Sequence, residues 1–101
     1  RFVKIGGEMI SLPAIEEALG SLAEEEGAEG PVLAVDAAPA EGRPELVLYT
    51  TLEVGRERAN AAIRAAGLSG LHNLRRVERV AELPLLGTGK VDYRRLRGEK
   101  G

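Results

Sequence analysis

The sequence of 101 residues predicts a single small α+β domain, in which helices flank a mostly antiparallel sheet of about three strands. Short apolar segments bounded by glycine and proline are typical of strands, and two segments with apolar residues three or four positions apart are typical of helices. A chain of this length buries roughly 65% of the surface that its unfolded form exposes. That is enough for one core and too little for a core plus a roomy enclosed active site.

The N-terminal segment predicts a β-hairpin. Residues 1–5 alternate apolar and basic side chains, Gly6 and Gly7 follow, and residues 8–10 resume the strand pattern. Glycine readily adopts the positive φ angles that both central positions of a tight two-residue turn require. We therefore expect the turn at the glycine pair.

The next segment predicts an amphipathic helix that begins after Ser11 and ends by Gly27 or Gly30. Ser11 is the expected N-cap, because its hydroxyl can accept a hydrogen bond from a backbone N–H of the first turn. Pro13 is tolerated there, because the N–H that it lacks would have no partner within the helix. The apolar stripe that would face the core is Leu12, Ile15, Leu19 and Leu22.

Two strands, a second helix and a third strand are expected in the middle of the chain. Residues 31–38 and 45–53 are rich in β-favouring types, and the turn residues 40–44 between them indicate an antiparallel hairpin. Residues 56–66 combine good helix formers with a narrow apolar face. Residues 74–83 predict a third, long strand, although their apolar positions fit neither helical nor strand periodicity well.

Near the C-terminus the sequence predicts a loop over residues 84–90 and a short helix over residues 91–97. Asp92 would cap that helix, an interpretation that we favour over a chemical role. His72 is expected to be a loop histidine, because no serine or aspartate constellation accompanies it.

Composition excludes several kinds of site. The chain has no cysteine and one histidine, so it can form neither a disulfide nor a thiolate or multi-histidine metal site, and we expect no metal ligands. No apolar run approaches the ~20 residues of a membrane span. Residues 1–4 lack the layout of a secretory signal.

Charge is divided unevenly along the chain. Residues 1–54 contain three basic and eleven acidic side chains, whereas residues 55–101 contain eleven basic and five acidic ones. A basic half favours an anionic partner, but the same counts would result from an acidic helix face and a basic strand face. The counts alone leave both interpretations open.

The segment Gly87-Thr88-Gly89-Lys90 is the strongest candidate for chemistry. It is not a phosphate-binding P-loop, because a proline lies five positions before Gly89 and a valine follows Lys90. The glycines would still hold out a lysine that can bring a compact positive charge to a phosphate or carboxylate. The alternative is an ordinary exposed lysine after a turn.

Two segments at opposite ends of the chain resemble motifs of the AMP-forming acyl/aryl synthetase superfamily. Residues 84–92, PLLGTGKVD, are similar to its C-terminal lysine motif. Residues 3–10, VKIGGEMI, are similar to the segment that follows the hinge between its large and small domains. The resemblance implies that residues 1–101 form the mobile C-terminal lid domain, with the hinge residue before Arg1.

Within the superfamily, the two ends are most similar to the synthetase part of bacterial bifunctional 2-acylglycerophosphoethanolamine acyltransferase/acyl-[acyl carrier protein] synthetases. This implies an ATP-dependent ligase that activates a fatty acid as an acyl-adenylate and transfers it to a pantetheine thiol, coupled to lysophospholipid reacylation. The implied location is the cytoplasmic side, with the parent enzyme at the bacterial inner membrane. An acyl- or aryl-CoA ligase is the alternative within the superfamily.

The resemblance also implies a role for the lysine motif. Lys90 would reach the α-phosphate during adenylation, where one ammonium stabilises the charge that builds in the transition state. The loop that carries it is Gly87, Thr88 and Gly89. ATP and Mg²⁺ would be bound mainly by a large N-terminal domain outside this chain, so the chain alone is expected to be inactive.

The hairpin has a second implied role, in thioester formation. Gly7, with its neighbours Gly6 and Glu8, would line the tunnel for the thiol of acyl carrier protein or coenzyme A. The resemblance is incomplete, because Leu85 and Tyr93 stand where family members often have lysine and arginine.

Arginines of the basic half would attract an acidic carrier protein or the phosphates of coenzyme A. The first candidates are Arg75, Arg76 and Arg79, followed by Arg94, Arg95 and Arg97. A different class of function is a stand-alone basic module that binds an acidic protein or nucleic acid. Three aromatic residues, with no aromatic and basic residues interleaved on a strand, argue against a binder of single-stranded nucleic acid.

Overall fold

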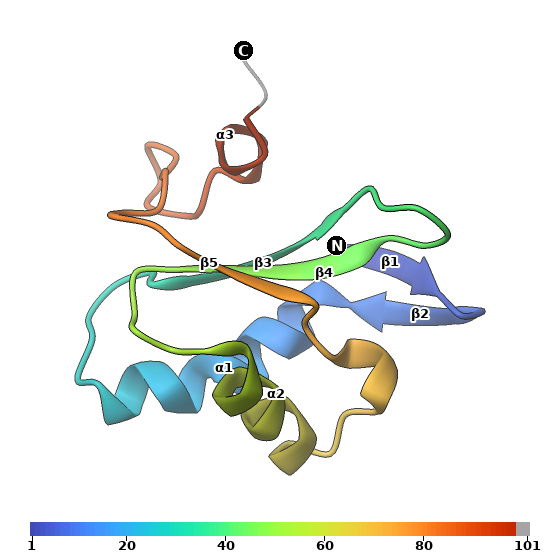
Figure 1. The fold of residues 1–101 in the computed structure, drawn as a ribbon. Helices are drawn as coiled ribbons and strands as arrows, with labels where there is room; N and C mark the ends of the chain where they lie inside the picture. Colours follow the sequence, from blue (N-terminus) through green and yellow to red (C-terminus); the bar gives the residue numbers. More distant parts are fainter. Residues whose placement is uncertain (99–101) are drawn as a thin grey trace.

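A computed structural model, which describes residues 1–98, contains two small sheets and three α-helices (Figure 1). The elements are β1 (Phe2–Ile5), β2 (Glu8–Ser11), α1 (Leu12–Glu25), β3 (Leu33–Ala38), β4 (Glu45–Thr50), α2 (Arg56–Ala65), the 3₁₀ turn η1 (Gly70–His72), β5 (Arg76–Arg79) and α3 (Tyr93–Leu96). β1 and β2 form one sheet, and β3, β4 and β5 form the main sheet. The predicted α+β class is confirmed.

The predicted N-terminal hairpin is also confirmed. β1 and β2 pair antiparallel with Ile5 opposite Glu8, so Gly6 and Gly7 form the two-residue turn between them. Their φ angles are +58° and +82°. These positive values are typical of the type I′ turn, whose twist matches that of the flanking strands.

α1 begins and packs as the sequence predicts. Ser11 Oγ accepts a hydrogen bond from the backbone N of Ala14 at 3.2 Å, which confirms the N-cap. The helix ends at Glu25, and Gly27 follows with a φ of +64°. The whole predicted stripe is buried: Leu12, Ile15, Leu19 and Leu22.

The main sheet has the strand order β3-β4-β5. β3 and β4 pair antiparallel as predicted, with Val35 opposite Leu48. The prediction of a long strand over residues 74–83 was wrong, because β5 covers four residues only. β5 also runs parallel to β4, so the main sheet is mixed, although two of the three strand pairings within residues 1–98 are antiparallel.

The direction of β5 and its late start follow from α2, and β5 ends where its partner β4 ends, with Thr50 opposite Arg79. This helix connects β4 to β5 as a crossover, which is the connection that a parallel strand pair requires. Leu74, two residues before β5, is buried. Its backbone N donates to Asn60 Oδ1 at 2.7 Å, and its carbonyl accepts from Asn60 Nδ2 at 3.1 Å. A side chain of α2 therefore takes the place of a strand partner at Leu74.

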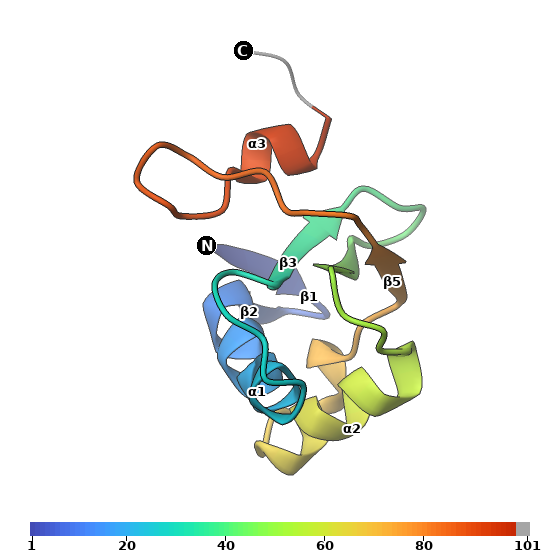
Figure 2. The ribbon, with the colours of Figure 1, turned by 90° about the vertical axis from the view of Figure 1, so that its left-hand side faces the viewer.

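The hydrophobic core lies between the main sheet, the hairpin and helices α1 and α2. Both helices cover one face of the sheet, whereas α3 and the loop before it lie beyond the other face (Figures 1 and 2). No residue of α3 is buried. The segment that carries Lys90 is therefore held outside the core. Within residues 1–98, no helix combines the length and the hydropathy needed to cross a lipid bilayer.

Candidate functional site

The loop before α3 is a small hairpin closed by backbone hydrogen bonds. Leu85 and Val91 form an antiparallel bridge at its base. At its tip, the backbone N of Leu86 donates to the carbonyl of Lys90 at 2.7 Å, and that of Gly89 donates to the carbonyl of Leu86 at 2.9 Å. Gly89 has a φ of +89°, which only glycine adopts readily. We call residues 85–91 the lysine hairpin.

The side chain of Lys90 is exposed, and within the described residues no ion pair involves its ammonium. Gly87 and Thr88 are exposed as well. Leu85 and Leu86 beside them have exposed fractions of 45% and 47%, which is high for large apolar side chains. The lysine hairpin thus exposes two large apolar side chains and one positive charge that has no ion-pair partner among residues 1–98.

Asp92 and His72 both have structural partners. Asp92 Oδ1 accepts a hydrogen bond from the backbone N of Arg95 at 3.2 Å, which confirms that it caps α3. His72 is buried in the turn η1, with Nδ1 3.0 Å from Ser69 Oγ. In the part of the chain that the structure describes, no three metal-binding side chains are grouped.

The hairpin turn at Gly6, Gly7 and Glu8 is exposed. A Cβ built on Gly7 would meet no atom within 4 Å, whereas one on Gly6 would lie 3.5 Å from Leu71 Cδ2. The turn lies at the far end of the β1–β2 ribbon, well away from the lysine hairpin (Figure 1). The structure therefore does not bring Lys90 and Gly7 into one site.

The three arginines expected on the third strand are not equivalent. Arg76 pairs with Glu45 at 3.2 Å, and Arg79 pairs with Glu53 at 3.0 Å. These carboxylates compensate part of the positive charge of β5. Arg75 precedes the strand, and its side chain lines a hollow between α2 and the turn that joins β3 to β4.

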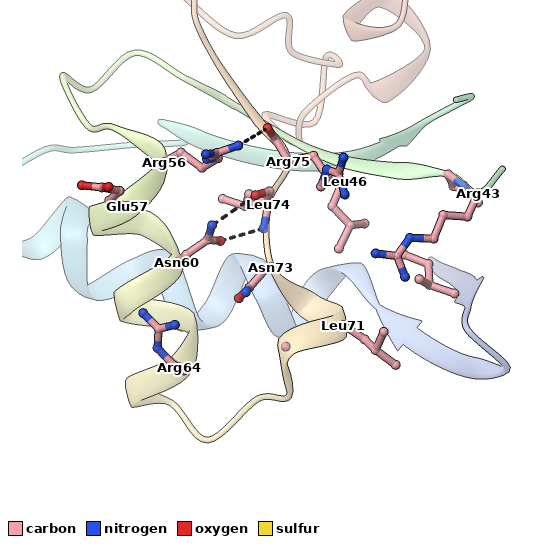
Figure 3. A pocket seen from close by; sticks show the side chains of 13 residues that line it. Arg43, Leu46, Arg56, Glu57, Asn60, Arg64, Leu71, Asn73, Leu74 and Arg75 are labelled. Atoms are coloured by element: carbon pink, nitrogen blue, oxygen red, sulfur yellow. Dashed lines mark hydrogen bonds between the residues drawn. The ribbon is translucent and has the colours of Figure 1, made fainter. Parts of the chain in front are cut away.

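Arg75 shares this hollow with three arginines from other parts of the fold (Figure 3). Arg43 comes from the turn between β3 and β4, and Arg56 and Arg64 come from α2. Among the described residues that line it, Glu57 alone is acidic. We call this hollow of about 620 Å³ the arginine hollow. Its excess of guanidinium groups favours an anion, and guanidinium matches phosphate geometry well.

Two polar features lie in the wall of the arginine hollow. Arg56 Nη1 donates to the carbonyl of Arg75 at 3.2 Å, which connects α2 to the start of β5. Asn73 Oδ1 is buried and has no hydrogen-bond partner within residues 1–98. Buried acceptors without a partner are uncommon in folded proteins.

Sequence reasoning missed three of these four arginines. The sequence does contain a signal for Arg56 and Arg64. Together with Asn60 they are spaced four residues apart and therefore share one face of a helix. Arg43 carried no such signal. Its place in the hollow depends on how the β3–β4 hairpin packs beside α2.

Tyr93 is connected to α1. Its hydroxyl donates to Glu16 Oε2 at 2.5 Å, and the guanidinium carbon of Arg1 lies 3.6 Å from its ring centroid. Burial raises the pKa of the Tyr93 hydroxyl above its usual value of 10.0, and the hydrogen bond to Glu16 raises it further. The hydroxyl is therefore held in its protonated, donating form.

The stability of the chain is expected to fall as the pH rises above about 10, and Tyr93 contributes to that fall. In the unfolded chain Tyr93 ionises near its ordinary pKa, while in the folded chain the raised pKa keeps it protonated. Its contribution is therefore complete below the unfolded pKa and is lost as the pH rises toward the folded one. Urea unfolding from about pH 9 to pH 11 should show a weaker decline for Tyr93→Phe than for the wild type. Tyr49, whose pKa is also raised by burial, is present in both proteins, so equal declines would contradict the role of Tyr93.

No family model matches the chain. Solved structures do match it. An acyl-CoA synthetase (AMP-forming)/AMP-acid ligase II-like protein from Dyadobacter fermentans has 20% identity and a TM-score of 0.73, over 96% of this chain and 28% of that one. An acyl-CoA synthetase from Brucella canis has 22% identity and a TM-score of 0.75, over 97% of this chain and 18% of that one. A fatty acyl CoA synthetase from Mycobacterium tuberculosis has 20% identity and a TM-score of 0.73, over 96% of this chain and 19% of that one.

These likenesses concern the fold. Almost all of the chain has the fold of one segment of each of these three proteins. The chain spans only 18% to 28% of the length of these three proteins.

Proposed function

We propose that the chain is the C-terminal domain of an AMP-forming acid–thiol ligase and that it supplies Lys90 to the adenylation step. The observation that carries the proposal is the exposed ammonium of Lys90, without an ion pair among residues 1–98, on a loop held by its own backbone hydrogen bonds. The fold likeness supports it, because each of the three matched proteins is named as a synthetase or ligase.

In the proposed first half-reaction, a carboxylate of the acid attacks the α-phosphorus of ATP. The bond to the β-phosphate oxygen breaks, and acyl-adenylate and pyrophosphate form. Negative charge grows on the α-phosphate oxygens in the transition state, and an ammonium beside them stabilises that state more than the ground state. ATP and Mg²⁺ would be bound mainly by a large domain of the same protein. This chain supplies the positive charge and excludes water with the apolar side chains of Leu85 and Leu86.

In the proposed second half-reaction, a pantetheine thiol attacks the acyl carbonyl of the adenylate. The thiol proton passes to solvent water, the carbon–oxygen bond to AMP breaks, and a thioester and AMP are formed. We assign the hairpin turn at Gly7 to this step, because an exposed glycine allows a slender thiol arm to pass close to the backbone. Lys90 and Gly7 lie on separate loops, so the two steps require two orientations of the domain.

The arginine hollow supports a phosphate-bearing acceptor for the second step. Leu71 lines the hollow and also lies next to Gly6, so the hollow is adjacent to the hairpin turn. Both acyl carrier protein and coenzyme A carry their pantetheine thiol on a phosphate. An acceptor whose phosphate is bound in the arginine hollow would therefore have its thiol arm near Gly7.

Reversing one charge in the arginine hollow is expected to weaken binding of the acceptor. In the full-length protein, Arg75→Glu should raise KM for the acceptor about tenfold in thioester formation and leave adenylation unchanged. Arg79→Glu is the matched control, because Arg79 is outside the hollow and pairs with Glu53. The effect of Arg75→Glu should also shrink as salt increases. An equal or larger rise in KM for Arg79→Glu would contradict the assignment.

More specifically, we propose that the whole protein is an acyl-[acyl carrier protein] synthetase coupled to lysophospholipid reacylation. It would be fused to an acyltransferase and located at the cytoplasmic side of the inner membrane. An acyl- or aryl-CoA ligase is the second candidate, and the names of the matched proteins favour it. Thioester formation with equal concentrations of holo-carrier protein and coenzyme A distinguishes the two. A stand-alone basic module would instead bind short oligonucleotides with an affinity that falls steeply as salt rises.

A further inference from the structure

The outer edge of β3 is covered by side chains in place of a strand. β3 is an edge strand, and the backbone N of Val35 donates to Glu16 Oε2 at 2.8 Å. The carbonyl of Val35 accepts a hydrogen bond from Arg1 Nη2. One acidic and one basic side chain therefore satisfy both backbone groups of Val35. Arg1 and Glu16 also pair with each other, with Nη1 and Oε1 at 3.0 Å.

Tyr93 adds the C-terminal segment to this cluster. Its hydroxyl donates to the same Glu16 oxygen that Val35 uses, and Arg1 lies over its ring. Hydrogen bonds to a carboxylate are stronger than those between neutral groups, and a guanidinium over an aromatic face adds cation–π attraction. We call Arg1, Glu16, Val35 and Tyr93 the edge junction.

A second polar link supports the same docking. Arg97 Nη1 lies 2.7 Å from Asp36 Oδ2, and the side chain of Asp36 is only 9% exposed. Tyr93 and Arg97 are four residues apart and share one face of the C-terminal helical turn. No residue of α3 is fully buried, so these polar links contribute to holding α3 against β3.

The edge junction is connected to the lysine hairpin through the backbone. Tyr93 follows Asp92, whose N donates to the carbonyl of Pro84 at 2.8 Å at the base of the hairpin. A tilt of α3 would therefore move the base of the hairpin and displace Lys90, which is next to Val91 at that base. Catalytic groups tolerate little displacement, since a misplacement of about 1 Å can cost about 100-fold in rate.

We propose that Glu16 and Tyr93 are positioning residues, which set the orientation of the lysine hairpin relative to Arg1 and the β1–β2 hairpin that follows it. The proposal rests on the adenylation role of Lys90. Neither side chain touches a reacting group. Glu16 contacts both Arg1, which precedes β1, and Tyr93, which begins α3, so the two segments move as one body when the domain changes orientation.

The test uses the full-length protein with Tyr93→Phe and Glu16→Gln. Tyr93→Phe keeps the ring under Arg1 and removes only the hydroxyl. It should lower kcat of ATP–pyrophosphate exchange about tenfold, on the scale of one lost hydrogen bond to a charged group, with KM for ATP little changed. Thioester formation from preformed acyl-adenylate should be retained. Glu16→Gln should act in the same direction.

Matched controls are available within the chain. Tyr49→Phe removes the other tyrosine hydroxyl, on β4, and Glu17→Gln changes the exposed neighbour of Glu16 on α1. Both should leave pyrophosphate exchange unchanged. Amide hydrogen exchange over residues 84–92 should be faster in Tyr93→Phe than in Tyr49→Phe. This second measurement tests the mechanical link without relying on activity.

Lys90→Ala in the same assays separates the two proposals. If Lys90→Ala lowers pyrophosphate exchange and Tyr93→Phe does not, the positioning role is overturned and the proposed function stands. If Tyr93→Phe lowers both half-reactions equally, the hydroxyl has only a structural role and the inference is overturned as well. If Lys90→Ala itself has no effect on exchange, the proposed function fails and the positioning role fails with it.

Discussion

Replacing Lys90 with alanine is expected to lower the rate of acyl-adenylate formation about 100- to 1000-fold in the full-length protein. Thioester formation from preformed acyl-adenylate should be largely spared. The expected size is that of removing one preorganised group that stabilises charge in the transition state. ATP–pyrophosphate exchange measures the first step, and thioester yield from synthetic acyl-adenylate measures the second.

The structure indicates that Lys90→Ala removes the ammonium without disturbing the fold. The ammonium of Lys90 has no ion pair within residues 1–98, so its removal leaves no carboxylate unpaired. The hydrogen bonds of the lysine hairpin come from the backbone and are kept in the variant. We therefore expect an unchanged free energy of unfolding and unchanged substrate binding by the rest of the protein.

Lys4→Ala is the control for the loss of an exposed lysine. Lys4 lies on β1, outside the lysine hairpin, and its replacement should leave pyrophosphate exchange unchanged. Equal loss of both half-reactions in Lys90→Ala would refute the assignment. An unchanged exchange rate would refute it more directly.

The second large effect is expected at Gly7. Gly7→Leu should lower thioester formation about 100-fold and change pyrophosphate exchange by only a few-fold, since a side chain at this turn would obstruct the thiol. Within this chain a Cβ at Gly7 meets no atom within 4 Å, so internal packing gives no reason for the loss. Pyrophosphate exchange and thioester yield, measured on the same preparation, would show whether Gly7→Leu affects the second half-reaction more than the first.

Backbone strain must be separated from obstruction. Gly7 has a φ of +82°, where any L-residue costs roughly 1–2 kcal/mol. Gly67→Leu is the matched control, because Gly67 has a φ of +88° and equally open surroundings after α2. Both variants should lose similar stability in urea unfolding, but only Gly7→Leu should lose thioester formation. The same loss in Gly67→Leu would attribute the effect to strain.

Much of the fold could be predicted because its signals are local. The glycine pair Gly6–Gly7 predicts the turn that it forms. Ser11 lies where the N-terminus of a helix needs a hydrogen-bond acceptor, and the apolar stripe that includes Ile15 predicts the buried face of α1. The short helix after Asp92 is predicted for the same reason. Each of these features depends on residues within one or two turns of the chain.

The β5 strand shows where local signals end. Residues 74–83 contain enough apolar and β-favouring types for a long strand. The backbone of Leu74, however, is hydrogen-bonded to the side chain of Asn60 of α2. The parallel direction of β5 depends on the crossover through α2, which no residue of β5 encodes. The strand's length and partner are therefore properties of the assembled fold.

Local patterns of residues were enough to predict the class of the domain, its hairpin and its first helix. They also point to the lysine that we propose carries the chemistry, because glycine turns, caps and motifs each depend on a few neighbouring residues. Which charged side chains meet depends on how distant segments pack. Arg43, Arg64 and Arg75 form one hollow, and Tyr93 reaches Glu16 across 77 residues of sequence. Electrostatic and hydrogen-bond partners depend on distances of a few ångströms, and packing of distant segments sets those distances.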